Sequence, residues 1–294
     1  MRFYETTPTH DLTYSDVFLV PSRSAVGSRL GVSLAPRDGT AASIPIVSAN
    51  MNSVTGPRLA ATLARRGGLG VLPQDMHHQD MDAAIRWVKA QPIGFDAAVT
   101  LAPSDTVATA LTLLPPAVGH GIVIHDQHGE FLGVIAAERL AHALPDAPLG
   151  DLLGDRMTSL DLDEIDGARA AFDLMVNAGI EFAPVMHEGK VVGTLSRTSA
   201  LRSTLYTPAL DARGRLSVAA AVGINGDPAG TARALAEAGA DVIVIDTAHG
   251  HQDGMVRAIA NVAALDLGLP IVAGNVVSAS AVRDLVGAGA TIVK

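Results

Sequence analysis

The chain has 294 residues, of which 48% are hydrophobic and 3% aromatic, a composition typical of α/β proteins with buried parallel strands. A net charge of −9, with no basic cluster larger than Arg65-Arg66, argues against nucleic acid, and the lack of 18 consecutive apolar residues or a signal core predicts a cytoplasmic, non-membrane protein. The absence of cysteine excludes disulfides, Cys-based metal sites and a thiol nucleophile within these residues.

The first 92 residues predict alternating strands and helices. Residues 12–21 indicate the start of a strand pair that ends at Pro21, and residues 44–50 indicate a strand. A helix is predicted over residues 57–66, where Gly67-Gly68 ends it. A strand over residues 69–72 and a second helix over residues 81–90 follow.

Residues 93–205 interrupt this alternation with an internal repeat of 60 residues. Gly129-Glu-Phe-Leu-Gly133-Val-Ile matches Gly189-Lys-Val-Val-Gly193-Thr-Leu, and a helix and a short strand precede each copy. Two such halves are needed to bury one shared core, so we expect a single inserted domain. The tandem resembles a pair of CBS motifs, whose family role is nucleotide sensing. The acidic ribose ligand of that family is absent, because Arg139 and Ser199 stand at its positions.

The alternation resumes in the last part of the chain. Strands are predicted over residues 216–225, 242–246 and 271–274 and from residue 291, with helices ending at Ala238-Gly239 and over residues 255–266 and 279–287. The order indicates an incomplete (β/α) barrel or a doubly wound sheet. We divide the chain into an N-terminal barrel part (residues 1–92), the insert (93–205) and a barrel continuation (206–294).

On the barrel interpretation, five strand ends become polar on the side where such barrels bind ligands. They are Ser48-Ala-Asn50-Met51, Pro73-Gln74, Asn225, Asp246-Thr247 and Asn275. Because Asp, Asn and Ser also end strands and cap helices, one position alone indicates little, whereas five together favour a binding site. An Asp at the end of a buried strand suits a ribose diol, since a carboxylate accepts two hydroxyl protons at once.

Specific motifs recur along the chain, and together they resemble the IMP dehydrogenase/GMP reductase family over its whole length. The motifs are Leu12-Thr-x-x-Asp16-Val-x-Leu-x-Pro21, Asn50-Met51-x-x-Val54, Ala219-Ala-x-Val-Gly223, Ile245-Asp246-Thr-Ala-His-Gly-His251 and Ala273-Gly-Asn275-Val-Val277. The resemblance implies a (β/α)8 TIM barrel, incomplete in this chain, with an inserted tandem CBS domain. It implies substrate binding by Asn50, Met51 and Asn275, with Met51 on the purine base and Asn275 beside the catalytic loop. It also implies cofactor binding by Asp246 and Thr247.

The family has two branches with opposite chemistry. GMP reductases convert GMP to IMP and ammonia with NADPH, whereas IMP dehydrogenases oxidise IMP to XMP with NAD⁺. Ala49-Asn50-Met51 and a segment containing Ser28-Arg29 resemble the reductases, in which the Ser-Arg pair contacts the NADPH 2′-phosphate. Pro73-Gln74 replaces the usual His-Lys of both branches, and the CBS insert is more typical of dehydrogenases. We favour the reductase and keep the dehydrogenase as the alternative.

Both branches use a cysteine thiolate bonded to purine C2, so that a hydride can leave or arrive there. In the family, the Gly-rich loop after the strand beginning at Thr291 carries this cysteine and binds the nucleotide phosphate and a monovalent cation such as K⁺. Because the chain has no cysteine, we expect a longer protein and no hydride transfer by these 294 residues alone. The resemblance also implies a homotetramer.

An alternative of another class is a nucleotide-binding regulatory protein with a degenerate barrel, which would bind ATP or GTP at the CBS pair. Calorimetry with these nucleotides would distinguish it from the enzyme. No metal site is predicted. His77-His78 is expected to be solvated, and the pair His249 and His251 has no third ligand within reach by sequence.

Overall fold

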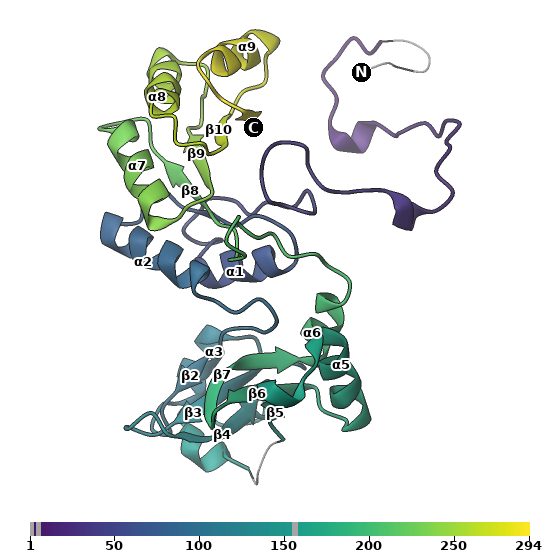
Figure 1. The fold of residues 1–294 in the computed structure, drawn as a ribbon, viewed down its shortest axis with the longest axis vertical. Coiled ribbons are helices and arrows are strands. Elements are labelled where there is room, and N and C mark those ends of the chain that lie inside the picture. Colours follow the sequence, from purple (N-terminus) through teal and green to yellow (C-terminus); the bar gives the residue numbers. More distant parts are fainter. Residues whose placement is uncertain (1–2, 4–6, 155–157) are drawn as a thin grey trace. The chain divides into compact units, whose positions relative to one another are not determined.

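The computed structural model describes residues 3, 7–154 and 158–294, and the chain divides into two units, residues 1–34 and 35–294 (Figure 1). The first unit contains 3-10 helices at Tyr14–Asp16 and Arg29–Gly31. The strand expected within residues 12–21 is therefore wrong. The carboxylate of Asp16 accepts hydrogen bonds from the backbone N and the hydroxyl of Thr13, both at 2.7 Å, and this local capping replaces strand pairing.

The second unit begins with helices and strands whose bounds are α1 (Pro57–Arg65), β1 (Val71–Leu72), α2 (His78–Lys89), β2 (Thr100–Leu101), α3 (Val107–Leu113), β3 (Gly121–His125), β4 (Phe131–Ala136), α4 (Ala137–Leu140), β5 (Leu160–Asp161), α5 (Gly167–Asn177), β6 (Phe182–His187), β7 (Lys190–Ser196) and α6 (Arg197–Ser203). It continues with β8 (Ala219–Val222), α7 (Pro228–Ala238), β9 (Val242–Asp246), α8 (Asp253–Ala263), β10 (Ile271–Gly274), α9 (Ala279–Gly287) and β11 (Ile292–Val293). Two further 3-10 helices lie at Leu149–Leu152 and Leu162–Glu164. Among the helices described, none is long and apolar enough to cross a membrane.

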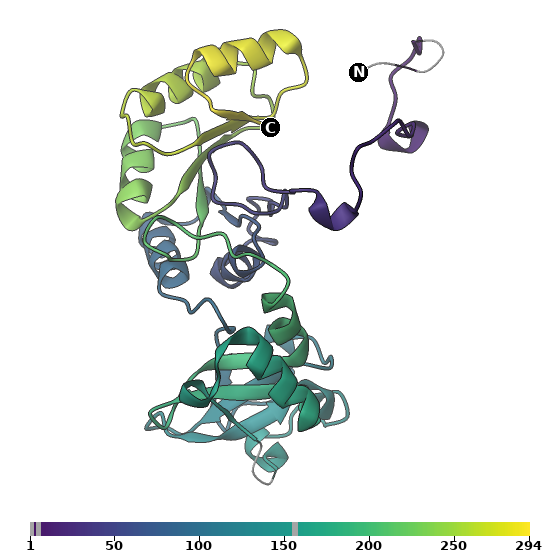
Figure 2. The same cartoon turned by 45° about the vertical axis from the view of Figure 1, so that its right-hand side comes forward.

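A five-stranded parallel sheet in the order β1-β8-β9-β10-β11 forms the centre of this unit. Its strands alternate with helices along the chain, and Figure 2 shows α7, α8 and α9 stacked along one side of it. The predicted α/β class with a parallel sheet is confirmed. The helices predicted over residues 57–66, 81–90, 255–266 and 279–287 all form, with ends shifted by up to three residues.

The two faces of the sheet bury different side chains. Ala220, Ile243 and Ile245 pack with the helices in the largest apolar cluster. The alternate residues, among them Ala221 and Val244, form a separate cluster on the opposite face. Because side chains alternate along a strand, this pattern also decides to which face of the sheet the last side chain of each strand points.

The strand expected over residues 44–50 is not formed. Only an isolated parallel bridge joins Val47 to Leu69, made by hydrogen bonds from Leu69 N to Ile46 O at 3.0 Å and from Ser48 N to Leu69 O at 3.0 Å. Pro45 lacks a backbone N–H and so cannot extend the ladder toward the amino end. The backbone of the segment therefore pairs with the sheet through this bridge alone among the described residues.

The 93–205 segment contains two three-stranded sheets, β2-β3-β4 and β5-β6-β7. Each has one parallel pair and one antiparallel hairpin, and each hairpin has a register shift next to the repeated glycine, Gly133 or Gly193. The predicted repeat is confirmed by these matching sheets. Each half has an apolar cluster of its own, and a smaller shared cluster joins Val123 and Val134 of the first half to Phe182 of the second, so the expected single core is only partly formed. The division into residues 1–92, 93–205 and 206–294 stays a prediction.

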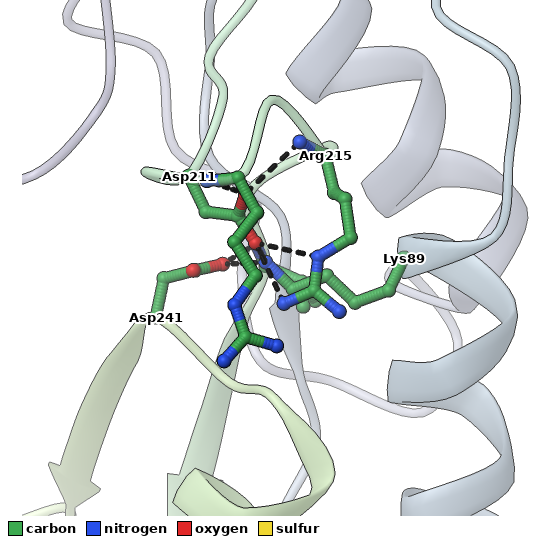
Figure 3. A network of polar contacts seen from close by, with 6 residues as sticks. Lys89, Asp211, Arg215 and Asp241 are labelled. Atoms are coloured by element: carbon green, nitrogen blue, oxygen red, sulfur yellow. Dashed lines mark hydrogen bonds and ion pairs between the residues drawn. The ribbon is translucent and has the colours of Figure 1, made fainter.

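An ion-pair network lies at the amino ends of the central strands (Figure 3). The ammonium of Lys89, a residue only 7% exposed, lies 2.9 Å from a carboxylate oxygen of Asp211 and 2.6 Å from one of Asp241. Arg215 Nε also donates to Asp211 at 2.9 Å, and the backbone N of Val218 donates to Asp241 at 2.7 Å. The network therefore joins the end of α2 to the segments that precede β8 and β9.

We expect the network to contribute stability at neutral pH that is lost in acid. Burial would raise the pKa of Asp211, but hydrogen bonds from the Arg215 backbone and the Lys89 ammonium outweigh it and hold that pKa well below the ordinary value of 3.8. A lowered folded-state pKa stabilises the fold above the unfolded-state pKa, and this contribution decreases as the pH falls below about 4.

Asp211→Asn leaves the buried Lys89 ammonium with one carboxylate fewer and should lower the free energy of unfolding by about 3 kcal/mol at pH 7. Urea denaturation between pH 7 and pH 3 measures the change and its decrease in acid. Asp173→Asn, which removes an exposed helix-surface ion pair with Arg169, is the control and should change stability by less than about 0.5 kcal/mol. Equal stability of both variants at pH 7 would contradict the assigned role.

Candidate functional site

Asp246 lies at the carboxyl end of β9, on the face of the sheet opposite the helices. Its position follows from strand parity, since Val242 and Val244 point to that face. The side chain is 18% exposed, so the carboxylate is largely buried yet accessible. In parallel α/β folds this edge of the sheet is where ligands bind.

Lys294, predicted only as part of a strand, reaches this carboxylate. Its Nζ lies 2.8 Å from Asp246 Oδ1. The register pairs Asp246 with Gly274 and Val293 with Ala273, so Gly274 lies between the strands of the two charged residues. A Cβ at Gly274 would lie 2.5 Å from Cγ of Lys294, which shows that only glycine leaves room for the lysine to pass.

Asn50 approaches the same carboxylate from the 44–50 segment. Its Nδ2 donates to Asp246 Oδ2 at 2.8 Å, so each carboxylate oxygen has one donor. The structure thus brings together two predicted site residues that are 196 positions apart in the sequence. The Met51 side chain, next to Asn50, is 56% exposed; its predicted contact with a purine base stays a prediction.

The backbone around Asn50 and Met51 is held by a buried threonine. Thr55, 1% exposed, donates its hydroxyl to the carbonyl of Ala49 at 2.6 Å and shares a hydrogen bond of 2.8 Å with the Ser48 hydroxyl. Ser48 Oγ in turn accepts a hydrogen bond from the backbone N of Val71 in β1 at 3.3 Å. This chain of hydrogen bonds attaches the turn before α1 to the central sheet.

Thr247 and Asn275 lie side by side at the same edge. Asn275 N donates to Thr247 O at 2.9 Å, Thr247 N donates to Gly274 O at 2.9 Å, and Gly250 N donates to Asn275 O at 2.8 Å. The side chain of Asn275 is exposed. The loops after β9 and β10 are therefore joined by backbone hydrogen bonds next to Asp246.

The remaining predicted positions have no hydrogen bond to Asp246 among the described contacts. Gln74 and Asn225 are exposed after β1 and β8, and the Gln74 amide oxygen lies 3.5 Å from the point where a Cβ of Gly223 would be. Ser28 and Arg29 belong to the first unit, where Arg29 begins a 3-10 helix, so nothing in the second unit tests their predicted role at the cofactor.

A cavity of about 390 Å³ adjoins the site. Asn50, Ser48 and Lys294 contribute polar atoms to its wall, and most of the remaining lining is apolar, from the inward face of the sheet and from residues 36–47. Leu69, Val71, Val244 and Val272 in this lining belong to the apolar cluster on the inner face of the sheet, a face that closed (β/α) barrels fill with packed side chains.

The Asp246 carboxylate, with one donor on each oxygen, suits a ribose diol better than a metal ion. A carboxylate has about four acceptor positions, and Asp246 uses two of them for Asn50 and Lys294, which leaves positions for two hydroxyl donors. Within residues 3, 7–154 and 158–294, no group of three or more His, Cys, Asp or Glu side chains is arranged to hold a metal. His251 instead contacts Asp284 at 2.8 Å.

Comparisons with known proteins agree with the motifs. The sequence model of the family described as "IMP dehydrogenase / GMP reductase domain" matches residues 11–294 of this chain. The chain is 46% identical over 297 residues to the GMP reductase of Mycobacterium tuberculosis, a match that covers 100% of this chain and 61% of that protein. It is 33% identical over 290 residues to the inosine-5'-monophosphate dehydrogenase of Halalkalibacterium halodurans, covering 96% of the chain and 59% of the relative. The chain therefore spans about three fifths of the length of these relatives.

Solved structures of GMP reductase from Trypanosoma brucei are also similar. A Cys-to-Ala variant gives a TM-score of 0.57 at 31% identity, covering 96% of this chain and 65% of that one. The enzyme in complex with guanosine 5'-triphosphate gives a TM-score of 0.56 at 29% identity, covering 96% and 70%. The same variant in complex with guanosine 5'-monophosphate gives a TM-score of 0.56 at 29% identity, and the match covers 96% of this chain and 62% of that one.

Thr55→Val is expected to destabilise the turn that carries Asn50 and Met51. Valine has nearly the same shape but leaves the Ala49 carbonyl and the Ser48 hydroxyl without this partner, at a cost of about 1–3 kcal/mol. Urea denaturation measures the loss. Thr55→Ser keeps the hydroxyl and should recover most of the stability; if it is as unstable as the valine variant, packing and not hydrogen bonding holds the turn.

Proposed function

Because this chain belongs to the IMP dehydrogenase/GMP reductase family, we propose that the protein it represents is a GMP reductase that converts GMP to IMP and ammonia with NADPH. The observation that carries the choice of branch is the identity of 46% to a GMP reductase along the whole chain, against 33% to a dehydrogenase. The segment Ala49-Asn50-Met51 and the arginine at position 29 support the same branch.

In the proposed site, NADPH would supply the hydride that replaces the amino group at purine C2. Asp246 would accept hydrogen bonds from the nicotinamide ribose, and Lys294 and Asn50 would hold its carboxylate in one orientation by a contact to each oxygen. Thr247 would extend the cofactor contact. Met51 would pack on the purine base and Asn275 would lie against the substrate.

The catalytic thiolate of the family would come from sequence outside these residues, since the chain contains no cysteine. The loop that carries it would also bind the substrate phosphate and a monovalent cation such as K⁺. We extend the proposal to a (β/α)8 barrel completed by that additional sequence, to a homotetramer and to a cytoplasmic location.

We also propose that the 93–205 segment is a CBS pair that binds ATP or GTP as an effector. The repeated helix-strand-turn-strand order and the shared core of the two halves support this role. A GMP reductase from T. brucei was solved in complex with guanosine 5'-triphosphate, which makes GTP one of the nucleotides to test.

IMP dehydrogenase is the second candidate, because relatives with that name match almost the whole chain at 31–33% identity. Two assays of the full-length protein separate the candidates: oxidation of NADPH with GMP, and reduction of NAD⁺ with IMP. We expect turnover in the first assay. Turnover with IMP and NAD⁺ alone would reject the reductase, and nucleotide binding without either reaction would favour a regulatory protein.

Asp246→Asn in the full-length protein should lower kcat/KM for NADPH about tenfold to a hundredfold, because a neutral amide is a weaker acceptor than a carboxylate. It also leaves Lys294 without its anionic partner. Steady-state kinetics measure the effect, and the circular dichroism spectrum should be unchanged. An unchanged KM and kcat for NADPH would remove Asp246 from the cofactor site.

Arg29→Ala should raise the KM for NADPH about tenfold, since a guanidinium–phosphate contact is lost, and leave the KM for NADH unchanged. Arg23→Ala, in the same unit, is the matched control and should behave as the wild type. If Arg29→Ala has the same KM for NADPH as Arg23→Ala and the wild type, the 2′-phosphate is bound elsewhere.

A further inference from the structure

The loop between β9 and α8, residues 247–252, follows Asp246 directly and is held on the end of β10. Backbone hydrogen bonds attach it there at Thr247 and at Gly250. Gly250 is buried, and a Cβ at this position would lie 2.8 Å from the carbonyl oxygen of Asn275 and 3.0 Å from its backbone nitrogen. Only glycine allows so close an approach, so the loop packs directly on the residues that follow β10.

Gln252 ends this loop as the N-cap residue of α8, but its side chain does not cap the helix. The residues that best cap a helix are Ser, Thr, Asp and Asn, whose short side chains accept a hydrogen bond from the first turn. The Gln252 amide instead reaches back along the loop, where Nε2 donates to the His249 carbonyl at 2.9 Å and to the Thr247 hydroxyl at 3.4 Å. Because the side chain does not stabilise the helix end, its contacts indicate a role in the loop.

The contact with Gln252 decides what the Thr247 hydroxyl can offer a ligand. The His249 carbonyl can only accept, so the amide must turn its NH₂ group toward the loop. The same NH₂ group faces the Thr247 oxygen, which is therefore the acceptor in this contact. Among the described residues this is the one hydrogen-bonding contact of the hydroxyl, so its hydrogen is left for an acceptor on a ligand.

Asp246 and Thr247 then offer a ligand opposite hydrogen-bonding groups. The ionised Asp246 carboxylate only accepts, whereas the Thr247 hydroxyl, whose oxygen already accepts from an amide, donates. A nicotinamide dinucleotide carries both kinds of partner, since its ribose hydroxyls donate and its carboxamide and phosphate oxygens accept. The arrangement therefore favours an acceptor oxygen of the cofactor as the partner of Thr247.

A second side-chain contact holds the same loop against α9. His251 Nε2 lies 2.8 Å from Asp284 Oδ2, and because a carboxylate only accepts, the imidazole nitrogen is the donor. The side chains of His251 and Asp284 are 35% and 57% exposed, so the pair adds little to the stability of the whole fold. Its effect is local, because it attaches the loop to the helix that follows β10.

We propose that Gln252 is a positioning residue for the cofactor site. By donating to the Thr247 hydroxyl and the His249 carbonyl, it fixes Thr247 as a hydrogen-bond donor to an acceptor oxygen of the dinucleotide. The contact between His251 and Asp284 holds the loop in which this happens. The inference rests on the proposed reductase function and deepens it by naming the group that sets the direction of the Thr247 hydrogen bond.

Fluorescence titration of the full-length protein with NADPH tests this role without turnover. Gln252→Ala removes the donor and should weaken NADPH binding about fivefold. Gln252→Glu keeps the shape but replaces the donor by an acceptor that competes for the Thr247 hydrogen, and should weaken binding about tenfold or more. In steady-state kinetics the KM for NADPH should rise, while kcat, the KM for GMP and the melting temperature stay as in the wild type.

A double-mutant cycle separates positioning from charge and folding effects. In a Thr247→Val background neither substitution of Gln252 should weaken NADPH binding further, since the hydroxyl on which it acts is absent. A loss of the same size in that background would show that Gln252 acts by another route and would overturn the proposal.

The contact with α9 has a matched control on the same helix. Asp284→Ala should weaken NADPH binding about threefold, and Asp284→Asn, which can still accept from His251, should recover most of the loss. Arg283→Ala, at the exposed neighbouring position, should bind NADPH as the wild type.

Failure of this inference is distinct from failure of the reductase proposal. If both Gln252 variants bind NADPH as tightly as the wild type, the positioning role is wrong and the reductase proposal is unaffected. If the wild-type protein binds no NADPH, both are wrong.

Discussion

The parallel register of β9, β10 and β11 is the constraint on which the candidate site depends. It places Asp246, Gly274 and Lys294 at one level on three neighbouring strands, and the central glycine leaves room for the lysine to reach the aspartate. A shift of one residue would turn Asp246 or Lys294 to the helix-covered face, because side chains alternate along a strand. The buried apolar residues on both faces of the sheet make such a shift costly, so core packing also positions the site.

The two ends of the sheet have different chemistry. At the amino ends, Lys89 pairs with two aspartates and Arg215 supplies a second positive charge, and the network ties α2 to the segments before β8 and β9. At the carboxyl ends, Asp246 keeps acceptor positions for a ligand while two donors orient it. This division suits parallel α/β folds, in which one end of the sheet serves stability and the other carries function.

Helix α1 links the turn that carries Asn50 and Met51 to the 93–205 segment. Its first turn follows Thr55, which anchors the segment of Asn50 and Met51 to the sheet. Its side chains Arg58 and Arg65 contact the 93–205 segment through the backbone of Ala97 and Ala98 and the carboxylate of Asp96.

The sequence by itself determined the family, the α/β class, the repeat and the edge at which Asp246, Thr247 and Asn275 gather, because periodicity and strand-end polarity are local properties. It did not reveal that residues 44–50 form only a bridge, that Lys294 contacts Asp246, or that Lys89 pairs with Asp211 and Asp241. Those pairings join residues far apart in the chain, and only the packing of helices and the register of strands decide which of many polar side chains meet.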